Sequence, residues 1–250
     1  RETSLEEARA AGAMALFASV AVPRARATPQ EADGGPGEDG LLAEASSLRA
    51  VVGGRPDLRA FLVANALWEA SLGALKTFVF LFVATGLGYS REATAGIIGG
   101  VALLVLPAAV LSGWLADRHG RARVMSWALP AYGLGLLVPA FTGHVAVLVP
   151  VMLVIGFGGG IVMTLPYALL QPLMPAGRHG LLTGFYSLSR GIGTALGPLL
   201  AGIAIEVLHG PFADTGGYAA MWLVCGGTVL ASVPAMAALR RLAGARIDHR

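Results

Sequence analysis

Three ionisable side chains stand within apolar stretches of the sequence, far from its other charges: Glu69, Lys76 and Arg190. Lys76 is the only lysine in the chain. A carboxylate, an ammonium group and a guanidinium group can bind charged solutes, exchange protons or pair with one another. A charge in the middle of a membrane helix costs at least about 2.5 kcal/mol on insertion scales, so such residues usually face a cavity or a partner. These three residues are therefore the first candidates for a functional site, with a purely structural ion pair as the alternative.

The spacing of two of these charges predicts a pair. Glu69 lies ten residues after Arg59, and Arg190 lies ten residues after Gly180. Ten residues of helix rise about 15 Å, roughly half of a membrane. If both helices run in the same direction, the two charges lie at one depth and can meet.

Polar neighbours of these charges recur at helical spacing, which places them on shared faces. Such faces predict the lining of a substrate or coupling cavity. Its candidate residues are Asn65, Glu69, Lys76, Thr164, Tyr167, Gln171, Tyr186, Arg190 and Thr194.

The elements that must position these residues are membrane helices. Apolar residues make up 55% of the 250 positions, and the mean hydropathy is +0.68. A helix needs about 20 apolar residues to cross the hydrocarbon layer. The fold class is therefore an all-α membrane protein with a six-helix transmembrane bundle over 58–239. The third and sixth runs carry few polar groups, which predicts lipid-facing supports. The runs are 58–86, 93–116, 124–142, 145–171, 180–208 and 217–239.

The distribution of arginine predicts the topology. Ten arginines flank one side of the predicted spans, whereas the opposite loops hold only Arg91. Arginine-rich loops are cytoplasmic in membrane proteins, so both ends of the six-span unit should face the cytoplasm. The net charge of +3 is divided among loops and does not form one basic patch, which argues against nucleic-acid binding. The ten are Arg55, Arg59, Arg118, Arg121, Arg123, Arg178, Arg240, Arg241, Arg246 and Arg250.

The parts outside the bundle have a different composition. Residues 24–57 are rich in Gly, Pro and acidic groups, as in a cytoplasmic linker, and 240–250 form a cytoplasmic tail. The apolar run within 1–23 is short; it is either the end of a preceding transmembrane helix or a surface-lying helix. The chain opens with Arg1, and we expect it to be the second part of a longer protein.

Neither a metal nor a cofactor is expected. The single cysteine, Cys225, lies in an apolar run, and the five histidines show no metal-ligand spacing. No Ser/His or Asp/Asp pair lies within the spans, so an enzyme is not expected.

One charged segment points to a family. The stretch GWLADRHGRARV (113–124) lies between the second and third runs, and GTALGPLLAG (193–202) lies in the fifth. The first resembles the signature loop of the major facilitator superfamily, and the second is similar to a glycine-proline element of its antiporters, with Ala201 in place of a second glycine. The resemblance covers about residues 55–240. The loop residues that carry it are Gly113, Asp117, Arg118, Gly120, Arg121 and Arg123.

The resemblance implies the C-terminal half of a transporter, with the N-terminal half as the alternative. It implies a secondary active permease in the cell membrane that moves a small solute by alternating access, together with the missing N-terminal half. It also implies that the loop is a cytoplasmic latch, with Asp117 holding helix ends together; the alternative is a topology anchor. A transporter-like receptor or scaffold is the other function considered, ahead of an intramembrane enzyme. The solute and the coupling ion, H⁺ included, stay open.

Overall fold

The structure is a computed structural model that describes residues 53–174 and 179–248. The segment 1–23, almost all of the linker and the last two residues of the tail lie outside the described residues. Within them the chain is helical and has no strand. The long helices are α3 (Pro56–Leu81), α4 (Arg91–His119), α5 (Arg121–Phe141), α6 (Val145–Leu170), α7 (His179–Val207) and α8 (Ala220–Asp248).

All six helices are long and apolar enough to cross a membrane, which confirms the six-span, all-α prediction. Short elements extend or connect them: the π-helical turn η1 (Phe82–Gly86) and the 3₁₀ turns η2 (Gln171–Leu173) and η3 (Ala213–Thr215). α8 continues to Asp248, so most of the segment 240–250 is helical and not an irregular tail.

Local sequence explains several helix ends. Pro56 occupies the first turn of α3, where its missing N–H costs no hydrogen bond. The side chain of Ser90 caps α4 by accepting from the N–H of Ala93 at 3.2 Å. Gly120 alone separates α4 from α5; its φ of 87° lies in the region that favours glycine.

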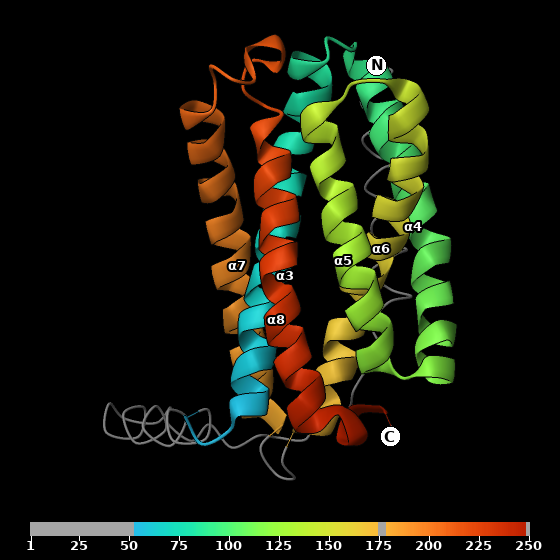
Figure 1. The fold of residues 1–250 in the computed structure, drawn as a ribbon, viewed down its shortest axis with the longest axis vertical. Helices are drawn as coiled ribbons and strands as arrows, with labels where there is room; N and C mark the ends of the chain where they lie inside the picture. The colour runs from blue at the N-terminus through green and yellow to red at the C-terminus, as the bar shows by residue number, and fades with distance from the viewer. Residues whose placement is uncertain (1–52, 175–178, 249–250) are drawn as a thin grey trace, which may run out of the picture. The chain divides into compact units, whose positions relative to one another are not determined.

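The helices alternate in direction (Figure 1). α3, α5 and α7 begin, and α4, α6 and α8 end, at one end of the bundle, which we call the arginine-rich end. The most extensive helix pairs each join one of the first three helices to one of the last three. α3 packs on α7 and α8, α5 packs on α6 and α8, and α4 packs on α6. The two halves of the bundle are therefore interleaved.

The core lies where α3, α5 and α8 meet. The indole of Trp68 donates to the hydroxyl of Ser232 at 2.7 Å, and Phe82 contacts Trp222 edge to face at 5.5 Å. In the most apolar 18-residue stretch of each helix, 56% of the residues of α5 are buried, but only 11% of those of α4. α5 nevertheless exposes Trp127, Leu134 and Phe141, so the prediction of a lipid-facing third helix stays a prediction. Low polarity does not distinguish a buried helix from a lipid-facing one, because lipid tails are as apolar as a protein interior.

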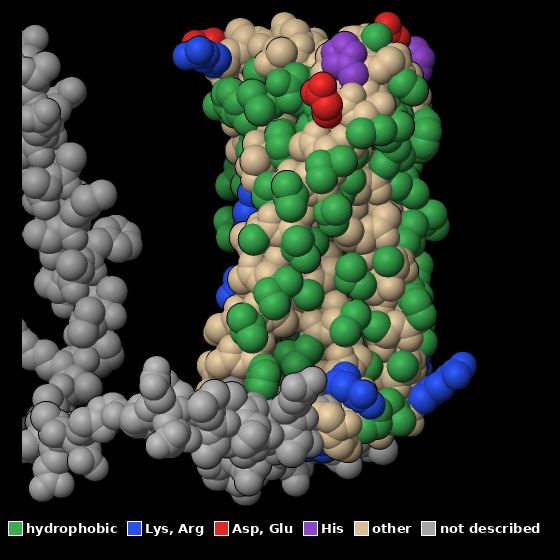
Figure 2. Space-filling model, turned by 90° about the vertical axis from the view of Figure 1, so that its left-hand side faces the viewer, with side chains coloured by type: hydrophobic (Ala, Val, Ile, Leu, Met, Phe, Trp, Pro, Cys, Tyr) green, Lys and Arg blue, Asp and Glu red, His purple; other side chains and the backbone are tan. Residues whose placement is uncertain are grey.

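Figure 2 shows the side of the bundle formed by α7. Hydrophobic side chains cover much of its length, most charged and histidine side chains gather toward the two ends, and some cationic side chains show at mid-height along one edge. The exposed apolar residues on this helix include Leu188, Ile192, Leu199 and Ile203. This belt is what a surface in contact with lipid or with other membrane helices requires.

Candidate functional site

The centre of the candidate site is an ion pair between α3 and α7. Nε of Arg190 donates to Oε1 of Glu69 at 2.7 Å, and the hydroxyl of Thr194 donates to Oε2 at 3.4 Å. The side chain of Glu69 is 11% exposed and that of Arg190 is 50% exposed. The carboxylate is therefore enclosed between the helices, whereas the guanidinium extends into open space. The structure brings together the two charges that the sequence placed at one depth.

A second polar contact lies one turn nearer the arginine-rich end. Nδ2 of Asn65 donates to the hydroxyl of Ser189 at 2.7 Å, and this hydroxyl donates to the carbonyl of Tyr186 at 2.9 Å. Oδ1 of Asn65 is buried and has no hydrogen-bond partner among the described residues. Ser189 was missed by the sequence analysis, although a serine next to Arg190 and three residues after Tyr186 is a usable signal.

Aromatic rings from two other helices contact the ring of Tyr186 on α7. Its ring stacks on Phe61 of α3 at 6.3 Å and contacts Tyr167 of α6 edge to face at 5.9 Å. The guanidinium carbon of Arg190 lies 5.7 Å from the centre of the same ring, a cation–π geometry. The site thus offers one cation on an aromatic surface.

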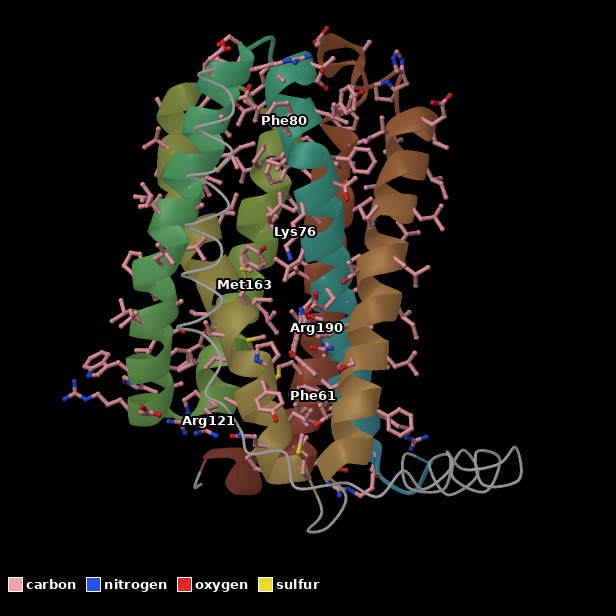
Figure 3. All side chains as sticks on the ribbon, turned by 180° about the vertical axis from the view of Figure 1, so that it is seen from behind. Phe61, Lys76, Phe80, Arg121, Met163 and Arg190 are labelled. Carbon is pink, nitrogen blue, oxygen red and sulfur yellow. The ribbon has the colours of Figure 1, made fainter. Side chains whose placement is uncertain are left out.

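Lys76 lies on the same side of the bundle. In Figure 3 the labelled Phe80, Lys76, Arg190 and Phe61 follow one another toward the arginine-rich end. Lys76 is exposed and forms no ion pair within 53–174 and 179–248. It is seven residues from Glu69, about 10 Å along α3. It is an accessible charge near the pair, but not a member of it.

Two predicted residues do not join this cluster. The hydroxyl of Thr164 lies 2.7 Å from that of Ser112, so it belongs to the contact between α4 and α6. An i+3 step leaves Thr164 turned by about 60° from Tyr167, enough to change its neighbour. Gln171 is exposed in η2 at the arginine-rich end, where Pro172 helps to end the regular helix.

The glycines of 193–202 hold α7 against α3. A Cβ at Gly193 or Gly197 would collide with the carbonyl oxygen of Ala66 or Ala70, respectively. In the other direction, a Cβ at Gly73 would lie 2.8 Å from the carbonyl oxygen of Thr194. This close approach brings Glu69 and Arg190 within bonding distance. The glycine-proline segment 193–202 therefore serves here to pack α7 against α3.

The charged loop lies at the arginine-rich end, as Arg121 shows in Figure 3. Nη1 of Arg121 donates to the carbonyl of Ala168 in the last turn of α6 at 3.1 Å, and Arg118 lies over the ring of Trp114 at 5.0 Å. Asp117 and Arg123 are exposed; neither forms an ion pair with another described residue. A Cβ at Gly113 would meet nothing within 4 Å. The latch role of the loop stays a prediction.

A second arginine reaches the same helix end. Arg55 pairs with Asp57 through two hydrogen bonds of 3.0 and 2.6 Å, and its Nη2 donates to the carbonyl of Leu173 at 3.2 Å. The hydrogen bonds with Asp57 raise the pKa of Arg55 above its ordinary value. Arg55 and Arg121 thus tie the starts of α3 and α5 to the end of α6, where the carbonyls and the helix dipole favour cations.

Comparisons with known proteins agree on one family. The profile of the Major Facilitator Superfamily matches residues 61–246. Over 129 residues the chain is 29% identical to the "Multidrug resistance protein B homolog" of Mycobacterium tuberculosis, a match that covers 52% of this chain and 23% of that protein. It is 28% identical to MdtD of Cronobacter sakazakii, a match that covers 48% of this chain and 27% of MdtD. Both matches span less than a third of the relative.

A solved structure shares the fold. The crystal structure of "the POT family transporter PepTSo" aligns with a TM-score of 0.59 at 18% identity, covering 78% of this chain and 38% of that one.

Proposed function

Since the chain belongs to the Major Facilitator Superfamily, we propose that its six membrane helices are one half of a secondary active transporter that works by alternating access. The chain is a multi-pass integral membrane protein. In the proposed mechanism a second six-helix half encloses a solute site near the midplane with this one, and rocking of the halves exposes that site to each side in turn.

We propose that α3–α8 are the C-terminal half and that the arginine-rich end faces the cytoplasm of a cell membrane. The distribution of arginine supports this orientation, with Arg55, Arg118, Arg121 and Arg123 at one end and Arg91 at the other. The C-terminal half is supported by the segment 24–57, which has the composition of a linker and precedes the six spans. In this arrangement the missing N-terminal half covers the side on which Lys76 and Arg190 are exposed.

The observation that carries the proposal is the Glu69–Arg190 pair. Half of the Arg190 side chain is exposed and lies beside the ring of Tyr186, whereas Glu69 is enclosed. Such an arginine is held in place by one partner and still has donors for another. We propose that these free donors bind the solute.

For the solute we propose small amphipathic organic compounds. Among the described residues, the exposed charges that lie within the spans and away from their ends are the cations Lys76 and Arg190. The rings of Tyr186 and Tyr167 lie beside Arg190, and the buried ring of Phe61 packs against Tyr186. Aromatic rings beside a cation suit a molecule with an apolar body and a polar or acidic group. The name of the mycobacterial relative, a multidrug resistance protein homolog, supports the same class.

We further propose H⁺ as the coupling ion. Glu69 is the carboxylate that lies in the middle of a span among the described residues, and Arg190 and Thr194 both donate to it. Protonation of Glu69 would weaken its bond to Arg190 and free the guanidinium for solute. A proton gradient would then bias the occupancy of the site.

Transport by the intact protein in proteoliposomes tests this function. We expect a fluorescent amphipathic dye to accumulate when a pH gradient is imposed, and Arg190→Gln to abolish accumulation. Arg241→Gln, which changes an exposed arginine at the end of α8, is the matched control and should transport normally. Dye binding with no movement across the membrane would contradict a transporter and favour the receptor-like alternative.

A further inference from the structure

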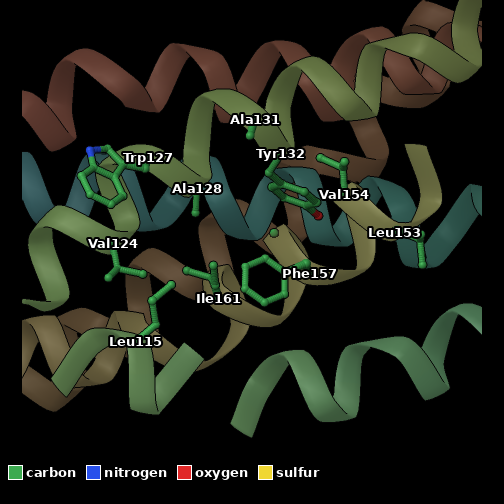
Figure 4. A pocket seen from close by; sticks show the side chains of 11 residues that line it. Leu115, Val124, Trp127, Ala128, Ala131, Tyr132, Leu153, Val154, Phe157 and Ile161 are labelled. Carbon is green, nitrogen blue, oxygen red and sulfur yellow. The ribbon is translucent and has the colours of Figure 1, made fainter. Parts of the chain in front are cut away.

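A cavity whose lining includes neither Glu69 nor Arg190 lies beside α6 (Figure 4). It has a volume of about 410 Å³ and is lined by residues of α4, α5 and α6. Ile161, one of its lining residues, is two positions from Met163, which Figure 3 shows on the side of Arg190. Two residues turn a helix by about 200°, so this cavity and the side that carries Arg190 lie on opposite faces of α6.

The walls of this cavity are apolar. They include Trp127, Ala131 and Tyr132 of α5, and Phe157 and Ile161 of α6. Trp127 is 59% exposed and Leu153 is 53% exposed, so the cavity is open along the side of the bundle. In a membrane protein this side meets acyl chains and not water. An apolar cavity with a lateral opening suits a hydrocarbon chain.

Basic side chains lie near the cavity toward the arginine-rich end. The ring of His119 lies 6.4 Å from that of Trp127, and Arg123 precedes Trp127 by one helical turn on α5. Arg118 lies one turn after Leu115, the lining residue of α4. Asp117, the acidic residue of this loop, is two positions from Leu115 and so points about 200° away.

These arginines remain available to an anion. Arg55 and Arg121 are engaged with Asp57 and with the end of α6, but Arg118 and Arg123 form no ion pair with other residues of the described part. Arg118 contacts only the π-face of Trp114, which leaves its N–H donors open. Exposed tryptophans beside arginines are typical of the headgroup level of a membrane.

We propose that this cavity binds an anionic phospholipid from the leaflet at the arginine-rich end, with one acyl chain between α4, α5 and α6 and the headgroup on Arg118 and Arg123. The length agrees: Arg123 and Tyr132 are nine residues apart, about 14 Å along α5, and one leaflet contributes about 15 Å of hydrocarbon. The site is separate from the transport site and does not depend on transport.

Native mass spectrometry of the intact protein with dioleoyl phosphatidylglycerol and dioleoyl phosphatidylcholine tests the proposal. The two probes share their acyl chains and differ in charge. We expect about tenfold tighter binding of the anionic lipid, and a loss of about fivefold in that affinity for Arg118→Gln or Arg123→Gln. Arg241→Gln, an exposed arginine at the end of α8, should leave the affinity unchanged.

A second pair of variants tests the acyl-chain cavity. Ala131→Phe places a ring in it and should remove the bound lipid, with Ala131→Leu as the milder substitution if the phenylalanine variant does not fold. Ala195→Phe adds the same ring to the exposed face of α7, and this variant should retain the bound lipid. Equal affinity for the two lipids, lipid retained by a folded Ala131 variant, or inorganic phosphate competing as strongly as the phospholipid would overturn the proposal.

Discussion

Arg190 donates to Glu69 across the contact of α7 with α3, and the two partners differ in exposure: the carboxylate is enclosed and the guanidinium is half open. The two halves of this ion pair are therefore not equivalent. Removing the arginine leaves an enclosed carboxylate without its charged partner. Removing the carboxylate leaves an arginine that water or a solute can still reach.

This asymmetry predicts the outcome of a double-mutant cycle. Arg190→Gln should destabilise the protein by about 1.5–3 kcal/mol, the scale of a hydrogen bond to a charged group, and Glu69→Gln by less, about 0.5–1.5 kcal/mol. The double variant should be more stable than Arg190→Gln alone, because the unpaired carboxylate is gone. Thermal unfolding measures stability, and liposome uptake measures transport, which should stay low in all three variants. Additive losses of stability would show that the pair contributes nothing as a pair.

Close packing predicts a strong effect at Gly197. Gly197→Ala places a methyl group against the carbonyl of Ala70 and should destabilise the protein by about 1–3 kcal/mol through overpacking. Gly184→Ala is the control on the same helix, since a Cβ there meets nothing within 4 Å. It should be neutral or slightly stabilising because alanine favours helix more than glycine does. Equal melting temperatures for the two variants would contradict the contact.

Lys76 should matter for transport and not for folding. It is exposed and forms no ion pair in the described part of the chain, so Lys76→Gln should change the melting temperature by less than about 1 °C, as for surface substitutions in general. Uptake of an acidic amphipathic dye should fall about tenfold, while uptake of a neutral dye changes little. A parallel loss for both dyes would mean that Lys76 does not bind the acidic group. Arg91→Gln is the control, because it also removes one positive charge but lies at the start of α4, at the end of the bundle opposite the arginine-rich end.

Substitutions of the loop residues Asp117 and Arg121 should have different effects on stability and transport. Arg121→Gln removes a bond to the end of α6 and should lower stability by about 1 kcal/mol. Asp117→Asn should leave the stability of the protein unchanged, since Asp117 makes no ion pair with another described residue. If the latch holds helix ends together, Asp117→Asn should increase cysteine accessibility on the cytoplasmic side and reduce transport. Unchanged accessibility and transport would leave the loop as a topology anchor.

Cysteine labelling tests the topology. Cys225 is buried and provides a silent background. Asp214→Cys at the opposite end should react with a membrane-impermeant maleimide added to intact cells, and Arg123→Cys should react only after the cells are opened. The reverse pattern would place the arginine-rich end outside and would contradict the proposed orientation.

The sequence predicted the six spans and the depths of the charges within them, because both depend only on counting residues along helices. The six spans are regular, and the helices of Glu69 and Arg190 run in the same direction, so equal residue counts led to equal depths. The cost of an isolated charge in hydrocarbon then predicted that each charge faces a cavity or a partner.

What the sequence could not predict depends on rotation and on neighbours. Thr164 differs from Tyr167 by a small rotation about α6, yet it bonds to Ser112 on α4. The contact between Asn65 and Ser189 requires knowing how closely α7 approaches α3, and glycine contacts set that distance. The burial of α5 follows from the interleaved order of the helices, which apolar composition does not reveal.

The one-residue connection at Gly120 has a consequence for biosynthesis. A long connection lets two neighbouring helices enter the bilayer one after the other. Gly120 is the only residue between His119, which ends α4, and Arg121, which begins α5. We therefore expect α4 and α5 to enter the bilayer as one hairpin whose charged tip, in the proposed orientation, stays on the cytoplasmic side.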